Sequence, residues 1–248
     1  VCGTGGSPIK TFNFSTISAF LVARAGFPVA KHGNRSNTSK SGSADLLEAL
    51  GVDLSAAPSK VEKTIEKIGI GFLYAPNLHP AMRYAAKPRK ELGIRTVFNL
   101  LGPLTNPASA TRHLLGVYSP ELVDKFPKVL RELGIERAMV VHGSIGIDEI
   151  SISGKTYVGE LNRGKISHYR ISPRNFGMQE ANPEDIADMP PIDSAGLAIE
   201  ILNGSREGPT RDVVLLNAGA GIYVAGGANS IEEGIDLASK SIKTGSAY

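Results

Sequence analysis

The sequence predicts an α/β fold with a mixed, mainly parallel central sheet. Short apolar segments of strand length alternate with segments of helical length along the whole chain, which is the pattern of βαβ units. The first 30 residues read as strand, glycine-rich loop, helix and strand, and such a crossover joins parallel strands in the right-handed sense. With 248 residues, 42% of them hydrophobic, the chain is long enough for one large domain, or for one large and one small domain.

Apolar spacing, capping residues and glycine stops predict the helices. The first helix, residues 15–25, has Asn13 or Ser15 available as its N-cap and Gly26 at its end. Gly51 closes a second helix in the same way. The predicted helices cover residues 15–25, 43–50, 59–68, 79–92, 120–133, 194–202, 211–225 and 230–244.

Apolar or alternating runs predict the strands. The run at 138–142 is fully apolar before its final histidine, as expected for a buried parallel strand. Residues 149–157 and 165–171 alternate like a pair of antiparallel strands. The remaining predicted strands are short and cover residues 1–2, 27–30, 71–75 and 116–118.

Bulk properties exclude several classes of partner. The formal net charge is only +3 without a long basic run, which gives little reason to expect a nucleic-acid partner. No segment approaches the roughly 20 apolar residues of a membrane helix. With Cys2 as its one cysteine the chain has no internal disulfide, which favours a reducing compartment, the cytoplasm. Because the sequence opens with Val1 on a strand end, we expect further sequence before it.

The glycine-rich loop Gly3-Thr4-Gly5-Gly6-Ser7 lies between the first predicted strand and the first helix. Glycines let the backbone approach a ligand closely, and free amides with a helix N-terminus favour an anion. The cluster Asn13-Phe14-Ser15-Thr16 at the helix start could bind phosphate oxygens or a metal that they hold. The loop is neither a Walker loop nor a dinucleotide fingerprint. A tight structural turn is the alternative, and the neighbouring motifs favour the anion site.

A basic segment, Lys31-His32-Gly33-Asn34-Arg35, directly follows the second predicted strand. Ligands bind at the carboxyl ends of strands in an open parallel sheet, so this segment and the glycine loop are expected at the same edge. Lys31 offers a point charge for phosphate, and Asn34 offers both donors and acceptors. Residues 36–43 are rich in hydroxyl groups and predict a flap over a polyanion. A solvated basic turn is the alternative.

An acidic pair, Asp148-Glu149, follows the apolar strand and a glycine turn. Adjacent carboxylates suit a hard cation with oxygen ligands, and Mg²⁺ would bridge them to a diphosphate. An exposed acidic turn is the alternative, and the glycine loop favours the metal site.

Together with residues 41–51, these motifs resemble the anthranilate phosphoribosyltransferase family. The resemblance continues through residues 79–82, 89–107 and 142–149, and more weakly through 217–219 and the last helix, so it spans nearly the whole chain. It implies an enzyme of tryptophan biosynthesis, a pentosyltransferase. This enzyme transfers the 5-phosphoribosyl group of phosphoribosyl pyrophosphate to the amine of anthranilate and releases pyrophosphate.

The resemblance also implies a domain organisation. The fold would be that of class II nucleoside phosphorylases, with a large α/β domain beside a small helical domain, usually in a homodimer. Residues 1–248 would be mainly the large domain that binds phosphoribosyl pyrophosphate, with roughly 78–104 as hinge and helical-domain contribution. The rest of the helical domain would precede residue 1, so that it is incomplete in this chain.

The resemblance further implies the site residues. Mg²⁺ would be held by Ser15, Asp148 and Glu149. Anthranilate would be bound by Gly3, Asn34, His79, Arg89 and Pro103. Phosphoribosyl pyrophosphate would be bound by Gly3, Gly6, Ser7, Thr11, Asn13, Phe14, Ser15, Thr16, Lys31, His32, Gly33, Asn34, Arg35, Ser36, Asn37, Thr38, Ser39 and Ser43. No residue is expected to react covalently, so catalysis would rest on positioning and electrostatics.

The chain departs from the family pattern beside the glycine loop, where Ser7 stands in place of the usual aspartate and Pro8 follows in place of glycine. Two rival interpretations stay open at this stage. One is a class II pyrimidine nucleoside phosphorylase, whose flap pattern differs from Lys31-His32-Gly33-Asn34-Arg35. The other is a non-catalytic relative that binds nucleic acid, which the small net charge and the Asp148-Glu149 pair disfavour.

Overall fold

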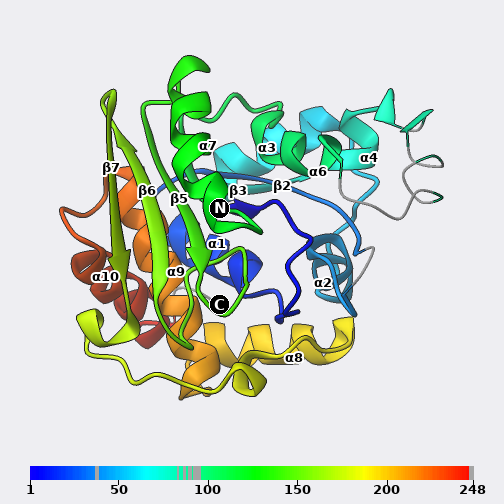
Figure 1. The fold of residues 1–248 in the computed structure, drawn as a ribbon. Coiled ribbons are helices and arrows are strands. Elements are labelled where there is room, and N and C mark those ends of the chain that lie inside the picture. Colours follow the sequence, from blue (N-terminus) through cyan, green and yellow to red (C-terminus); the bar gives the residue numbers. More distant parts are fainter. Residues whose placement is uncertain (37–38, 83, 86–87, 89–90, 92–95, 246–248) are drawn as a thin grey trace.

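The computed structural model describes residues 1–36, 39–82, 84–85, 88, 91 and 96–245 (Figure 1). Its largest sheet has five strands in the order β1-β4-β5-β6-β7. β1 pairs with β4 and β4 with β5 in parallel, whereas β5–β6 and β6–β7 are antiparallel. These strands are β1 (Cys2–Gly3), β4 (Arg112–Gly116), β5 (Arg137–Gly143), β6 (Thr156–Asn162) and β7 (Lys165–Ile171).

A second, two-stranded sheet joins β2 (Val29–Gly33) and β3 (Ile70–Tyr74) in parallel. Three of the five strand pairings among the described residues are therefore parallel, which confirms a mixed, mainly parallel α/β fold. The opening strand, helix and strand do not share one sheet, because β1 pairs with β4 and β2 pairs with β3.

Helices cover both faces of the five-stranded sheet (Figure 1). One core lies under α1 (Phe14–Arg24), α9 (Pro209–Ala225) and α10 (Ile231–Lys243), and the other lies under α7 (Pro120–Glu132). Alternate residues of β5 serve the two cores, since Met139 faces the first and Val140 the second. This double burial explains why the strand is apolar throughout.

The other helices surround the two-stranded sheet and the lower edge of the molecule (Figure 1). They are α2 (Ser43–Ala49), α3 (Pro58–Ile68), α4 (Ala75–Leu78), α6 (Phe98–Leu101) and α8 (Pro191–Leu202), with short 3-10 turns at Gly102–Leu104, Pro173–Phe176 and Pro183–Ile186. No described helix is long and apolar enough to cross a membrane.

Most predicted elements are confirmed to within one or two residues, and five were wrong in their bounds. The helix expected at 194–202 begins three residues earlier, at Pro191, because proline suits the first turn of a helix. β2 runs on to Gly33, so Lys31 lies within a strand and not after it. β4 runs from Arg112 to Gly116, whereas the prediction placed the strand at 116–118. The prediction missed its start because Arg112 and His113 are polar. The strand expected at 149–157 is a buried loop that reaches β6 only at Thr156. The helix expected at 79–92 falls partly outside the described residues, and its predicted start, His79, follows the end of α4.

Candidate active site

The glycine loop leaves the edge strand β1 and folds over the segment between β5 and β6. Gly5 and Gly6 have φ of 67° and 78°, the left-handed region that favours glycine. The Gly5 N–H donates to Asp148 Oδ2 at 2.7 Å, and the Ser7 hydroxyl donates to Asp148 Oδ1 at 2.7 Å. Both oxygens of the Asp148 carboxylate therefore hold the loop, although the residues are more than 140 positions apart.

Two glycines paired across β1 and β4 make room for Asp148. Gly3 and Gly116 are register partners, and neither has space for a Cβ. A Cβ on Gly3 would lie 3.0 Å from Asp148 Cγ and closer to its Oδ2, and one on Gly116 would overlap the Asp148 carbonyl oxygen. The absence of side chains at both positions is thus what lets the acidic segment lie against the sheet.

The start of α1 supplies hydroxyl groups to the second carboxylate. The Thr11 hydroxyl donates to Glu149 Oε2 at 3.1 Å, and the Ser15 side chain also hydrogen-bonds Glu149. Burial is the main cause that raises the pKa of Glu149 well above its ordinary value, and the neighbouring Asp148 adds to it. Thr11, Lys31 and Ser15 oppose that rise only in part.

Asn13 is the N-cap residue of α1, one of the two caps predicted, but its side chain makes no capping hydrogen bond. Its Nδ2 donates to the Ser41 carbonyl at 3.0 Å, and its Oδ1 accepts from the Ser194 hydroxyl at 3.1 Å. Asn13 thus ties the predicted flap to α8. Phe14 and Thr16 are buried, so their side chains belong to the interior of α1.

Lys31 is the buried cation of this site, with 4% of its surface exposed. Its Nζ donates to the Val1 carbonyl at 3.2 Å. Burial lowers its pKa, while the nearby thiol of Cys2 and the carboxylate of Glu149 act in the opposite direction. The Lys31 side chain is therefore shielded from water.

The described part of the flap is organised by carboxylates of α2. Asp45 Oδ2 accepts from the backbone N–H of Ser36 at 3.0 Å and of Gly42 at 2.8 Å. The Arg35 guanidinium donates to Glu48 through Nη1 and Nη2 at 2.8 Å and to Asp45 through Nη1 at 2.9 Å. Arg35, a predicted phosphate-binding residue, thus pairs with protein carboxylates. Of the other predicted flap residues, Asn37 and Thr38 lie outside the described residues.

The hydroxyl groups of the flap also bond to one another. The Ser36 and Ser39 hydroxyls lie 2.6 Å apart, and the Ser43 hydroxyl donates to the Asn34 carbonyl at 3.3 Å. Gly33 has no room for a Cβ because the Phe72 ring and the Ser43 hydroxyl fill that space. Among the described residues, the predicted phosphate-binding segment from β2 to α2 is thus held together by its own hydrogen bonds.

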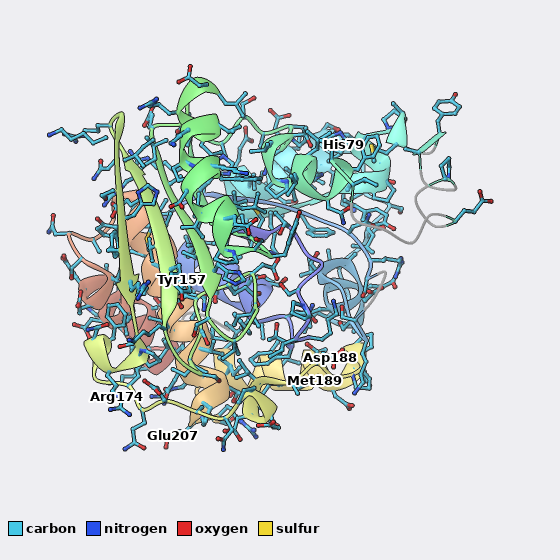
Figure 2. The ribbon with its side chains drawn as sticks, viewed as in Figure 1. His79, Tyr157, Arg174, Asp188, Met189 and Glu207 are labelled. Carbon is cyan, nitrogen blue, oxygen red and sulfur yellow. The ribbon has the colours of Figure 1, made fainter. Side chains whose placement is uncertain are left out.

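The predicted anthranilate residues do not all lie at one place: Gly3 lies in β1 against Asp148, whereas His79 and Pro103 lie at the α4 and α6 end of the molecule, where Figure 2 shows His79. His32 Nδ1 is 3.2 Å from the Gly102 carbonyl, and its Nε2 is 3.1 Å from His79 Nε2. Pro103, the residue after Gly102, is buried, whereas Asn34 is exposed. Arg89 lies outside the described residues.

The contact between His32 and His79 predicts a pH dependence of stability. Burial first, and then His79, lower the pKa of His32 from its ordinary value of about 6.5. The unfolded chain therefore binds this proton at higher pH than the folded chain does. The contribution of neutral His32 is present above about pH 6.5 and is lost as the pH falls through the folded pKa.

His32→Gln is expected to weaken the dependence of Tm on pH, measured between about pH 5 and 7.5. A smaller slope will remain from His113, whose pKa burial also lowers. A variant with the wild-type slope would show that His32 is not the titrating group.

The site also contains residues that the sequence analysis missed. Gly116 and Asp45 shape the acidic segment and the flap, and Asn217 on α9 bonds the backbone next to Glu149. Their signal in sequence was weak, since a lone glycine after an apolar strand and an aspartate in a helix are commonplace.

Known proteins with similar sequences show the family to which this chain belongs. A family profile described as "Glycosyl transferase family, a/b domain" matches residues 1–248. The anthranilate phosphoribosyltransferase of Desulfosudis oleivorans is 53% identical over 247 residues, which cover 100% of this chain and 73% of that protein. The one from Aquifex aeolicus is 49% identical and is covered to 72%. This chain belongs to the anthranilate phosphoribosyltransferase family.

Solved structures of anthranilate phosphoribosyltransferases share the fold. The Thermus thermophilus structure superposes with a TM-score of 0.94 at 47% identity, covering 100% of this chain and 73% of that one. The Saccharomyces cerevisiae structure, described as a complex with PRPP and Mg, superposes with a TM-score of 0.89 at 36% identity. The match covers 99% of this chain and 69% of that one. The predicted fold class, enzyme class and function, an anthranilate phosphoribosyltransferase of tryptophan biosynthesis, are thereby confirmed.

Proposed function

We propose that this enzyme binds phosphoribosyl pyrophosphate between the glycine loop, Lys31 and the flap, and transfers its 5-phosphoribosyl group to the amine of anthranilate. The observation that carries the proposal is the contact of Asp148 with Gly5 and Ser7, beside that of Glu149 with Thr11. These contacts bring the predicted anion loop, the start of α1 and the predicted metal ligands into one site. Relatives described with PRPP, Mg and 4-fluoroanthranilate support the choice of ligands.

The residues present fit Mg²⁺. No group of three or more His, Cys, Asp or Glu side chains gathers among the described residues, so protein carboxylates alone do not complete a cage. Magnesium is commonly held by one or two carboxylates together with substrate phosphates and water. Asp148, Glu149 and the Ser15 hydroxyl would hold it, and when bound it would neutralise charge on the diphosphate.

Catalysis by the protein itself would come from position and charge. The N–H groups of Gly5 and Gly6 and the ammonium of Lys31 would stabilise the departing pyrophosphate. Displacement at the anomeric carbon, with oxocarbenium character, needs only a well-placed amine. Asn34 and Arg89 would hold the anthranilate carboxylate, with His79 and Pro103 lining its entry and Gly3 between the two substrates.

One assay tests the proposal. Anthranilate fluorescence is followed with phosphoribosyl pyrophosphate and Mg²⁺, and consumption that requires both is expected. Phosphorolysis of thymidine or uridine without anthranilate consumption would instead indicate a nucleoside phosphorylase. Salt-dependent DNA binding without turnover would indicate the nucleic-acid-binding relative. Either result would overturn the proposal.

Ser7 offers a prediction about the diphosphate side. Its neutral hydroxyl donates to Asp148, so Ser7→Asp would replace this bond with a second carboxyl group that repels the first when both are charged. We expect the KM for phosphoribosyl pyrophosphate to change by about threefold or more and its dependence on Mg²⁺ to steepen. Ser7→Ala, which removes the bond without adding charge, is the matched control. Unchanged kinetics in Ser7→Asp would show that this position is tolerant.

We further propose that the enzyme works as a homodimer in the cytoplasm, with residues 78–104 contributing to a hinge and a helical domain. The single cysteine supports the compartment, and the family supports the assembly. Light scattering of the purified chain would test the oligomeric state.

A further inference from the structure

We propose that Asn217 is a positioning residue that holds the Asp148-Glu149 segment in place for its cation. Asn217 lies in the middle of α9 and is 2% exposed. Its Oδ1 accepts from the Ile150 N–H at 3.2 Å, and its Nδ2 donates to the Ile150 carbonyl at 2.9 Å. The side-chain amide thus bonds both backbone groups of Ile150, and we call this pair of bonds the Asn217 clamp.

The clamp takes the place of a strand partner. The segment between β5 and β6 has the alternating pattern of a strand, yet it belongs to no sheet before Thr156. Ile150 is buried, and a buried backbone amide and carbonyl need partners. Asn217 supplies both, and its Nδ2 also donates to Val213 within α9 at 2.9 Å, so the amide has little freedom to rotate.

The position of the clamp connects it to the site. Ile150 follows Glu149 directly, and Asp148 is two residues away. The clamp therefore fixes the position of the backbone from which both carboxylate side chains extend. On their other side, Gly3 and Gly116 leave no spare room around Asp148. The acidic segment therefore lies between a packed sheet edge and a hydrogen-bonded helix.

The same turn of α9 also contacts the helix that carries Ser15, the other predicted metal ligand. The buried Ser18 hydroxyl donates to the Val214 carbonyl at 2.9 Å, and Ser18 lies one turn after Ser15 on α1. Residues 213–217 thus connect the helix that carries Ser15 with the segment that carries Asp148 and Glu149. Because α9 packs behind the sheet on both α1 and α10 (Figure 1), it provides a rigid common base.

This inference rests on the proposed function, and its test separates the two. Asn217→Ala removes the clamp, and Tyr223→Phe is the matched control. Tyr223 lies on the same helix, and its hydroxyl anchors α9 to Glu160 of β6 at 2.8 Å, without touching residues 148–150. Mn²⁺ replaces Mg²⁺ as the probe, and its binding in the presence of phosphoribosyl pyrophosphate is followed by electron paramagnetic resonance.

In Asn217→Ala, the Mn²⁺ concentration at half-saturation is expected to rise by about tenfold, as for other residues that orient metal ligands. The KM for anthranilate should change less than twofold. Hydrogen exchange in the ligand-free protein should accelerate in the peptide containing Ile150. Tyr223→Phe should lower Tm while both metal affinity and this exchange stay as in the wild type.

Wild-type Mn²⁺ affinity and wild-type exchange in Asn217→Ala would overturn the inference, as would an equal loss of affinity in Tyr223→Phe. If Asn217→Ala does not fold, Asn217→Ser keeps an uncharged hydroxyl that can bond one of the two Ile150 backbone groups, and a smaller loss of affinity is expected. A wild-type chain that does not consume anthranilate would contradict the proposed function, whereas the exchange measurement tests the clamp without it.

Discussion

Asp148→Asn combined with Glu149→Gln is expected to lower turnover in saturating Mg²⁺ by about a thousandfold, the largest effect of any change predicted for this enzyme. The two carboxylates lie side by side in a partly enclosed site, where burial and Asp148 raise the pKa of Glu149. A cation that neutralises a leaving diphosphate contributes several kcal/mol to the transition state, and each tenfold in rate corresponds to about 1.4 kcal/mol. Steady-state kinetics over a Mg²⁺ titration measures the loss.

The control removes the same charge elsewhere. Glu62→Gln with Glu66→Gln takes two exposed carboxylates from α3, and turnover should stay within about twofold of the wild type. The double variant at Asp148 and Glu149 should remain folded, because the amides keep the volume of the carboxylates. At position 148 the amide oxygen can still accept from the Gly5 N–H, and the amide nitrogen can donate to the Ser7 hydroxyl. Full magnesium-dependent turnover in that variant would refute the metal assignment.

Gly116→Ala is expected to lower kcat/KM by at least about a hundredfold and also to lower Tm. A Cβ at this position would overlap the Asp148 carbonyl oxygen, so either β4 or the acidic segment must move. A displacement on the order of 1 Å at a site that works by positioning costs about a hundredfold in rate. The displacement would also strain the loop contact between Gly5 and Asp148.

Gly196→Ala on α8 is the matched control, because nothing lies within 4 Å of its added Cβ. In a helix this change removes conformational freedom from the unfolded chain and is expected to stabilise the fold by up to about 1 kcal/mol. Kinetics and thermal unfolding of both variants check the pair. Wild-type activity in Gly116→Ala would show that the acidic segment has room that the packing does not indicate.

The elements that sequence predicted well are those with local causes. The helices after Gly208 and Ser230 begin and end where capping residues and apolar spacing place them. The apolar run of β5 likewise follows from burial on two faces. In these segments the residues that decide the structure are near neighbours in the chain.

The errors have a common cause in contacts between distant residues. Ile150 and Ile152 alternate like strand residues, but they are buried in a loop whose backbone is satisfied by Asn217. Asparagine is a common helix cap, yet the Asn13 side-chain amide hydrogen-bonds Ser41 and Ser194 instead. The local sequence pattern cannot show whether a polar group bonds to a neighbour in the chain or to a distant residue.

The sequence by itself determined the α/β class and the family, because the glycine loop, the basic segment and the acidic pair are continuous motifs. Only the tertiary structure decided how they meet. The loop amide of Gly5 is held by Asp148, the start of α1 reaches Glu149, and α9 fixes the backbone between them and β6. The physical reason is that a buried carboxylate or amide must find its partners wherever the chain brings them, and those partners lie across the fold and not along the sequence.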